Sequence, residues 1–359
     1  MSNPYKAVVI GCGKMGRNQA RILKNHPDFA LVAVCDIVQD AVDAATAELE
    51  VNGYTGLDAM IEAEQPAVVA IPTTSAAHAP LTRKVAPHDC VKGIYCEKPM
   101  ATNMKDAREM NRSCKDNGVI LVINHQRRIG ADLIKTKELI DSGAIGDVKV
   151  VRGQCAGDFL SGGTHVADSL MFLVGDPNVE WVVGQVVRDA AAVRKELERF
   201  GDYQGHPIES GAMAVAQLAN GVRAEFFTGD LRQDGRHYQD YVIEGTRGQI
   251  WRLSDSAKPQ NLFVANGETS GTHIQDESLK GIPAPDGKGP WWPVEVENDG
   301  KSGIVRGYTF LAGSLRDGTT HPMCGDFALN HFEIAMGLFE SARTGKRVFP
   351  PVQADRFPL

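Results

Sequence analysis

The sequence predicts an α/β protein in which a doubly wound parallel sheet is followed by an α+β region with a large, mostly antiparallel open sheet. Up to about residue 125, short apolar runs alternate with amphipathic stretches, a pattern typical of parallel strands covered by helices on both faces. A glycine-rich turn joins the first apolar run to the first amphipathic stretch. Beyond residue 145 the runs are longer and alternate between polar and apolar residues, as in antiparallel strands.

Five apolar runs predict strands in the first region, at 6–10, 30–35, 67–71, 91–96 and 119–124. Amphipathic stretches at 15–25, 38–50, 76–86 and 103–117 predict the helices between them. We therefore expect a first domain over residues 1–125.

The second region, 126–359, begins with a predicted helix at 130–142. Strands are predicted at 148–157, 179–189, 211–218, 222–228, 238–244 and 249–253, with Asn220-Gly221 as a hairpin turn. A last helix at 326–343, closed by Gly345, is expected to return to the first domain. Residues 254–306 are polar and rich in Gly and Pro, so we expect an excursion outside the core.

Composition excludes several classes of protein. With 38 Lys and Arg against 45 Asp and Glu, the net charge is −7, which argues against nucleic-acid binding. No apolar run approaches the roughly 20 residues of a membrane helix, and no signal peptide is recognisable, so we expect a soluble, cytoplasmic protein. The seven cysteines show no metal-ligand spacing and are expected to be reduced, and no metal site is predicted.

The glycine-rich turn has the pattern GxGxxG between a predicted strand and a predicted helix, which indicates a dinucleotide site of the Rossmann type. Gly11 permits the tight turn, Gly13 lets a pyrophosphate approach the backbone, and Gly16 allows the helix to pack closely. The free N–H groups of the helix N-terminus favour the phosphates. The predicted phosphate loop consists of Gly11, Cys12, Gly13, Lys14, Met15 and Gly16.

The second strand ends at Asp36, which lies 20 residues after Gly16. A carboxylate there accepts hydrogen bonds from ribose hydroxyls and repels the 2′-phosphate of NADP. Ile37 and Val38 follow and supply no cation for that phosphate. The sequence thus predicts NAD as the cofactor.

Several further motifs resemble those of the Gfo/Idh/MocA oxidoreductases, the family of glucose–fructose oxidoreductase and inositol dehydrogenase. The most specific is Glu97-Lys98-Pro99 after a predicted strand. The other matching segments are GCGKMG at 11–16, Asp36, Ile71-Pro72-Thr73 with His78, GGTHVAD at 162–168 and YVIEGTRG at 241–248.

The resemblance implies hydride transfer between nicotinamide and a carbohydrate, a cyclitol or a related small molecule. It also implies a second domain that binds substrate and forms a homodimer or homotetramer through the outer face of its sheet. Beyond the phosphate loop and Asp36, the implied cofactor contacts are Ile37, Ile71, Pro72, Thr73, His78, Glu97, Lys98 and Gln126.

By this resemblance, Lys98 reaches the reacting hydroxyl. The chemistry is reasonable, because oxidation of an alcohol removes a hydride and a proton together. An ammonium group beside the oxygen stabilises a developing alkoxide, and a lysine with a lowered pKa can relay the proton.

The family's second-domain helix commonly offers an Asp and, four residues later, a His. We match Asp168 to the first, which places Phe172 at the second, so the usual acid–base group is missing there. On a helix, residues 165, 168 and 172 lie within an arc of about 60°, opposite the apolar positions 166, 170, 173 and 174. We expect His165 to take over the proton transfer or to bind a hydroxyl, Asp168 to orient His165 or Lys98, and Phe172 to form an apolar floor. The alternative is that His165 only bonds the backbone at the helix start.

Gln126, Arg127 and Arg128 follow the last strand of the first domain and are candidates for substrate contact. The arginines would favour an anionic sugar or acid. Alternatively, one of them pairs with an acidic neighbour at the domain junction. Trp291 and Trp292 either stack on a sugar or cover the cleft, or they anchor an oligomer arm.

Two other functions remain open. Some members of the family oxidise a sugar transiently, eliminate its glycosidic substituent and reduce the product again, so that NAD is catalytic and a glycoside is cleaved. A non-enzymatic sensor on the same scaffold is disfavoured, because Lys98 and Asp168 are present and the chain has no added DNA-binding element.

Overall fold

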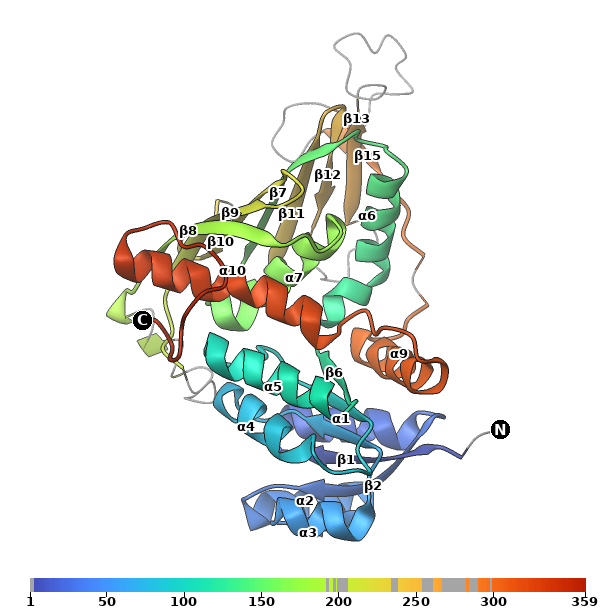
Figure 1. Cartoon of the computed structure of the whole chain (residues 1–359). Helices are drawn as coiled ribbons and strands as arrows, with labels where there is room; N and C mark the ends of the chain where they lie inside the picture. Colours follow the sequence, from blue (N-terminus) through green and yellow to red (C-terminus); the bar gives the residue numbers. More distant parts are fainter. Residues whose placement is uncertain are drawn as a thin grey trace.

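The computed structural model describes residues 3–191, 194, 195, 198, 206–233, 238–253, 261–266, 282, 283, 290–297 and 299–359. Figure 1 shows the parallel sheet and its helices at one end, in blue and cyan, and the large open sheet at the other. Helix α10 (Gly325–Thr344), in red, crosses between them and packs on both the open sheet and α5 (Met104–Asp116).

The first sheet has six parallel strands in the order β3-β2-β1-β4-β5-β6. Its central strands are buried on both faces, and Val8, Val69 and Ile94 are fully inaccessible, as uninterrupted apolar runs predict. The order reverses between β1 and β4, where such sheets bind ligands at the carboxyl ends of their strands. The strands are β1 (Tyr5–Ile10), β2 (Phe29–Cys35), β3 (Asn52–Tyr54), β4 (Val68–Ile71), β5 (Gly93–Cys96) and β6 (Ile120–Ile123).

Helices cover both faces of this sheet, as the amphipathic stretches predict. Besides α5 they are α1 (Lys14–Asn25), α2 (Gln39–Leu49), α3 (Leu57–Glu64) and α4 (Ser75–Val85). The sequence analysis did not identify β3 and α3. The strand has only three residues, Asn-Gly-Tyr, and the first two are exposed, so it carries no apolar signal.

The second sheet has nine strands within the described residues and is antiparallel except where β10 pairs with β7. The helices α6 (Ala131–Asp141), α7 (Thr164–Leu173) and α10 pack on it, and the predicted fold class is confirmed. Its strands are β7 (Val148–Cys155), β8 (Val179–Val187), β9 (Gly211–Leu218), β10 (Arg223–Gly229), β11 (Gln239–Gly245), β12 (Gly248–Arg252), β13 (Leu262–Asn266), β14 (Ile282–Pro283) and β15 (Pro290–Pro293).

Part of the polar stretch 254–306 belongs to this sheet, which differs from the expected excursion. Strands β13, β14 and β15 extend its edge. Phe263, Ala265 and Trp291 are each 9% exposed and form a small apolar cluster with Trp251 packed against it. Trp292 pairs with Val264 across the strands. Residues 254–260, 267–281, 284–289 and 298 lie outside the described part of the chain.

The chain returns to the first sheet near its end. Helix α9 (Gly303–Asp317) places Tyr308 in stacking contact with Tyr95 of β5, with 4.2 Å between the ring centroids. Cys324, just before α10, forms an isolated antiparallel β-bridge with Val122 of β6. The division at residue 125 remains a prediction. In the described part of the chain, no helix combines the length and the apolarity needed to cross a membrane.

Candidate functional site

The glycine loop lies between the end of β1 and the start of α1, and its three glycines meet three different constraints. Gly11 has φ +105°, a left-handed conformation that favours glycine. A Cβ at Gly13 would meet nothing within 4 Å, which leaves open space over the exposed backbone. A Cβ at Gly16 would lie 1.7 Å from the Gly11 carbonyl oxygen, so α1 can approach only with glycine there. This geometry fits a dinucleotide pyrophosphate at the start of α1.

Asp36, directly after β2, fixes this loop. Its Oδ2 accepts a hydrogen bond from the Cys12 N–H at 2.7 Å, and its Oδ1 accepts one from the Val38 N–H at 3.0 Å. Each oxygen keeps a lone pair for a ribose hydroxyl. The next side chain, Ile37, is 92% exposed and uncharged. These acceptor oxygens therefore fit the ribose hydroxyls of NAD.

The end of β4 closes the loop from the other side. The Pro72 carbonyl oxygen lies 3.1 Å from the place of a Cβ on Gly11. His78 is buried, with Nδ1 2.7 Å from the Pro99 carbonyl oxygen and Nε2 3.2 Å from that of Thr73. Burial lowers the pKa of His78 to about 4, so the ring is neutral and can donate to one of these two carbonyl oxygens.

Glu97 is the centre of a buried polar network at the end of β5. Its Oε1 accepts hydrogen bonds from Gln19 of α1 and from Asn124 after β6, both at 2.7 Å. Tyr308 donates to Gln19 at 2.6 Å, and Tyr95 donates to Asn124 at 2.7 Å. Burial raises the pKa of Glu97, against the attraction of Lys98. The predicted cofactor contact at Glu97 remains untested, and the contacts seen join four elements beneath Lys98.

Lys98 reaches across from β5 to the second region. Its Nζ donates to the carbonyl oxygen of Ser161 at 3.0 Å, within the short π-helical turn η2 (Phe159–Gly163) that precedes α7. Burial lowers the pKa of Lys98, against the attraction of Glu97 and Asp158. A half-buried ammonium group thus stands at the carboxyl edge of the parallel sheet.

His165, at the start of α7, is 6% exposed. Burial lowers its pKa well below the ordinary value, and the charges of Arg127 and Lys98 add to this effect, so its ring is neutral and lies near Lys98. Its Nδ1 has no hydrogen-bond partner among the described residues. A neutral imidazole with an uncommitted nitrogen can accept a proton or bind a hydroxyl.

Asp168 does not orient His165 or Lys98, which corrects the sequence prediction. It is 2% exposed and binds Arg128, whose Nε lies 3.0 and 3.2 Å from its two carboxylate oxygens. Asp176 binds the other edge of the Arg128 guanidinium at 2.8 and 2.7 Å. Burial raises the pKa of Asp168 to about 6, although Arg128 opposes this. Of the alternatives for the two arginines, Arg128 pairs with acidic neighbours.

The proposed stripe on α7 is also different in the structure. The helix is buried on nearly all sides, so His165 and Asp168 do not share an open face. Phe172 is half-buried and covers Arg128, with its ring centroid 5.2 Å from the guanidinium carbon. Its expected role as a substrate floor is not supported by this placement. The apolar positions Val166, Leu170 and Leu173 face the core as predicted.

Gln126 and Arg127 are both half-buried in the short helix η1 (Gln126–Ile129). The Gln126 carbonyl oxygen lies against the start of α9, 2.8 Å from the place of a Cβ on Gly303. The guanidinium carbon of Arg127 lies 5.1 Å from the centroid of the Tyr238 ring. Its charge acts on both Lys98 and His165, so Arg127 belongs to the same site.

Three buried side chains that could ligate a metal converge behind His165. Ligand atoms of His125, Asp168 and His331 lie within 4.8 Å of one another. The residues come from three separate elements, so spacing along the chain could not reveal them. Arg128 already binds Asp168, and burial together with the charges of Lys98 and Arg128 lowers the pKa of His125. These positive charges oppose a cation, and we assign no metal here.

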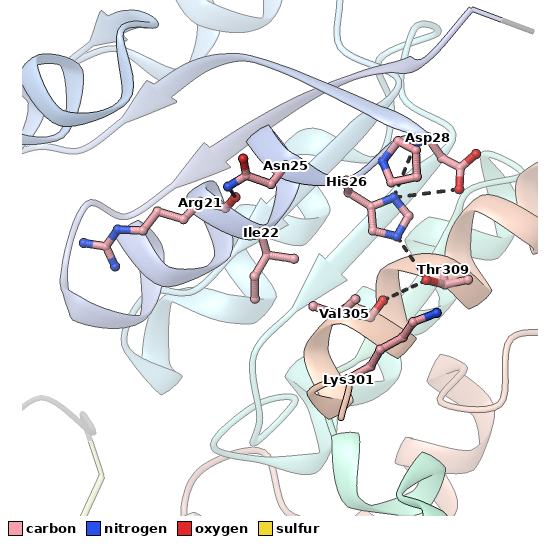
Figure 2. Close-up of a pocket in the computed structure, with 9 residues that line it drawn as sticks. Arg21, Ile22, Asn25, His26, Asp28, Lys301, Val305 and Thr309 are labelled. Carbon is pink, nitrogen blue, oxygen red and sulfur yellow. Dashed lines mark hydrogen bonds and ion pairs between the residues drawn. The ribbon is translucent and has the colours of Figure 1, made fainter. Parts of the chain in front are cut away.

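A pocket of about 440 Å³ lies at the far end of α1, between that end and α9 (Figure 2). His26 lines it, and a hydrogen bond of 3.0 Å joins its Nε2 to the Oγ1 of Thr309. The pocket contains none of the predicted site residues, and the glycine loop lies at the opposite end of α1.

The sequence analysis missed four residues that shape the site. Ser161 supplies the carbonyl for Lys98, and Asp158 caps the same turn. Glu209 accepts a hydrogen bond from the N–H of Phe159, the first residue of that turn. The ring of His125 lies against that of His165, with 5.4 Å between the ring centroids. Only Asp158 carried a signal, as an acidic residue directly before a turn, where capping residues are favoured.

Comparison with known proteins places this geometry in a family. Residues 5–125 match the model of the oxidoreductase family with an NAD-binding Rossmann fold, GFO_IDH_MocA. The chain is 24% identical to an inositol 2-dehydrogenase of Rhizobium meliloti, over 72% of this chain and 78% of that protein. It is 28% identical to a 2,7-anhydro-N-acetylneuraminate hydratase of Mediterraneibacter gnavus, over 67% of this chain and 65% of that protein, slightly less than two thirds of its length.

The fold also occurs in a solved oxidoreductase of Agrobacterium radiobacter in complex with NAD⁺, L-tartaric acid and magnesium. That structure superposes with a TM-score of 0.76 at 19% identity, over 97% of this chain and 98% of the other. The glycine loop and Asp36 fit the same cofactor, NAD. Residues 5–125 thus match the NAD-binding Rossmann domain of the GFO_IDH_MocA oxidoreductase family.

Proposed function

We propose that this protein is an NAD-dependent dehydrogenase or reductase acting on a hydroxyl-bearing carbon of a carbohydrate or cyclitol. The observation that carries the proposal is the hydrogen bond from Lys98 Nζ to the Ser161 carbonyl oxygen, which holds the ammonium at the carboxyl edge of the parallel sheet, one turn before the neutral ring of His165. The inositol dehydrogenase among the relatives supports the substrate class.

Lys98 is the hydrogen-bond donor to the substrate oxygen in this proposal. Among the described residues, its Nζ bonds to the Ser161 carbonyl alone, which leaves two N–H donors for the substrate. The charge stabilises an alkoxide as the hydroxyl proton leaves, and removing one such donor from an enzyme typically slows it by about 10²–10³-fold. Bound NAD supplies the hydride acceptor for oxidation and the hydride donor for reduction.

His165 accepts the hydroxyl proton or holds a neighbouring hydroxyl through Nδ1. The family's Asp and His, four residues apart, correspond to Ser161 and His165, because these two positions lie at Lys98 while Asp168 and Phe172 lie at Arg128. His165 is then the family's usual acid–base group. The departure from the family pattern is the serine at position 161.

The cofactor is held by the phosphate loop 11–16, by Asp36 and by the segment Ile71-Pro72-Thr73 that closes the loop. His78 fixes this segment from behind. On the substrate side, Gln126 and Arg127 are the remaining candidates. A guanidinium beside Lys98 favours a substrate that carries a carboxylate, such as a sugar acid.

A second candidate function is net glycoside cleavage with catalytic NAD. The specific observation in its favour is the similarity to 2,7-anhydro-N-acetylneuraminate hydratase, whose name does not describe a simple dehydrogenase. Lys98 and His165 could serve the transient oxidation equally well, so the two functions differ in products and not in these residues.

A substrate panel separates the two functions. Inositols, neutral sugars, sugar acids and aryl glycosides are each assayed with NAD for NADH formation and for release of the aglycone. We expect NADH to accumulate with at least one polyol or sugar acid. Aglycone release without net NADH would support glycoside cleavage. If no compound yields NADH or a free aglycone, the proposal is contradicted.

A further inference from the structure

Two buried carboxyl groups lie behind Lys98, in a part of the site that the proposed function does not use. Asp158 is 3% exposed and Glu209 is 2% exposed. Buried acidic groups are costly unless they are bound, so their contacts should indicate what they do.

Asp158 caps the turn η2. Its Oδ1 accepts a hydrogen bond from the Ser161 N–H at 2.8 Å. Its carbonyl oxygen accepts bonds from the N–H groups of Gly162 and Gly163 at 3.0 and 3.2 Å. Three of the five backbone N–H groups of the turn are therefore held by one residue.

Glu209 holds the first residue of the same turn. It lies in the segment just before β9, and its Oε1 accepts a hydrogen bond from the Phe159 N–H. Phe159 and Leu160 are fully buried, so the turn is also packed in the core. The carbonyl that this arrangement leaves pointing outward is that of Ser161, which receives the Lys98 ammonium.

The charges of the pair agree with this arrangement. Burial, together with the charge of Asp158, raises the pKa of Glu209 to about 8, so Glu209 is a neutral acid at pH 7. Its Oε1 accepts the Phe159 N–H, which leaves the proton on Oε2. Asp158 favours the charged form of Lys98 and so raises the pKa of that amine.

We propose that Glu209 and Asp158 are positioning residues, which hold the turn 159–163 and thereby place the Lys98 ammonium at the reacting oxygen. The consequence for turnover rests on the proposed function. The consequence for the Lys98 amine does not, and it can be measured without any substrate.

The test uses two matched pairs of variants of the full chain. Glu209→Gln keeps an acceptor for the Phe159 N–H and Glu209→Leu does not, and both are uncharged like the native acid. Asp158→Ser keeps a cap and Asp158→Ala does not, and both lack the charge. Within each pair, a difference therefore reports the hydrogen bond alone. The second pair keeps the test valid if Glu209→Leu does not fold.

The first readout is the pKa of the Lys98 amine, from competitive amine labelling across pH followed by peptide mass spectrometry. The groups acting on Lys98 are Glu97, Asp158, Arg127 and Cys155, and the two members of the Glu209 pair do not differ in charge from each other. We expect the Lys98 pKa to rise by about one unit in Glu209→Leu relative to Glu209→Gln, because a released ammonium regains water. The Lys98 pKa should likewise be higher in Asp158→Ala than in Asp158→Ser.

The second readout is turnover on a substrate found by the panel. The non-bonding member of each pair should lose about tenfold or more in kcat against its partner, with KM for NAD unchanged. As a control, Glu64→Leu removes a buried carboxylate bound to Asn52 and Tyr54 in the first domain and should leave the Lys98 pKa unchanged.

Equal Lys98 pKa values within both pairs would overturn the proposal. If the Lys98 pKa changes only in Glu209→Leu and Asp158→Ala while the protein oxidises no compound of the panel, the positioning role is supported and the proposed function is refuted.

Discussion

The cofactor side and the reaction side of the site are built in different ways. The cofactor side is local in sequence: a glycine loop of six residues, held by one carboxylate 20 residues later. The reaction side draws on β5, the turn η2, α7 and the segment before β9, and its key contacts link Lys98 to Ser161 and Phe159 to Glu209. The difference predicts that binding of the cofactor and placement of the reacting groups can be perturbed separately.

The largest effect is expected for Lys98→Met. Under the proposed function, loss of the Lys98 ammonium should lower kcat by about 10³–10⁴-fold, since it removes both the donor and the proton relay. NAD binding should persist, because the glycine loop and Asp36 do not contact Lys98 through any bond in the described structure. Steady-state kinetics measures the loss. Lys92→Met, at an exposed lysine just before β5, should behave as the wild type.

Arg128→Met should affect stability more than chemistry. It leaves Asp168 buried without its cation and also frees Asp176, and breaking a buried pair in this way costs about 3–5 kcal/mol in the free energy of unfolding. Denaturant unfolding measures the change. Arg316→Met, at an exposed pair with Asp317, should cost less than about 1 kcal/mol. Equal costs for the two variants would show that the buried network is not structural.

His165→Ala should lower kcat by about 10–100-fold, a smaller loss than at Lys98, because water can replace part of an acid–base function. His88→Ala, at a half-buried histidine after α4, serves as the control in the same assay. Near-wild-type activity for His165→Ala would support the alternative that His165 has only a structural role at the start of α7.

Asp36→Ala should weaken NAD binding by about tenfold, which corresponds to one charge-assisted hydrogen bond, and should narrow the preference for NAD over NADP. Fluorescence titration with both reduced cofactors measures this. Asp43→Ala, at an exposed residue of α2, should change neither affinity. Tighter binding of NADP than of NAD by the wild type would contradict the role assigned to Asp36.

The smallest effect concerns pH. Burial lowers the pKa of Lys98 below its ordinary 10.5, so the ammonium is lost as pH rises through that lower value. Reduction needs the proton of this ammonium. Its rate should therefore fall at a pH below 10.5, the ordinary pKa of a lysine. In Lys98→Arg, any remaining rate should keep rising or stay level there, because guanidinium does not deprotonate.

The two regions also differ in how far the sequence could predict them. The first strand and the glycine loop are contiguous, and Asp36 follows at a fixed spacing of 20 residues, so the pattern alone predicts their arrangement. Helical periodicity placed His165, Asp168 and Phe172 on one stripe, but it could not show that Arg128 and Asp176 stand opposite Asp168. Glu209 acts through a contact 50 residues away along the chain, which no local pattern encodes.

The second sheet shows the same limit. Its long alternating strands were predicted closely, and β9 (Gly211–Leu218) without error. The strands β13 to β15 were missed because they lie in a polar stretch rich in Gly and Pro, and β14 and β15 are short and contain prolines, as edge strands often do.

A crossed measurement on Lys98→Met and Asp36→Ala tests the separation of the two regions most directly. Each variant is titrated with NADH and then examined for single-turnover hydride transfer at saturating NAD. Lys98→Met should bind NADH within about threefold of the wild type and transfer almost no hydride, whereas Asp36→Ala should bind about tenfold more weakly and transfer at nearly the native rate. Hydride transfer retained in Lys98→Met, or lost in Asp36→Ala at saturation, would contradict the account.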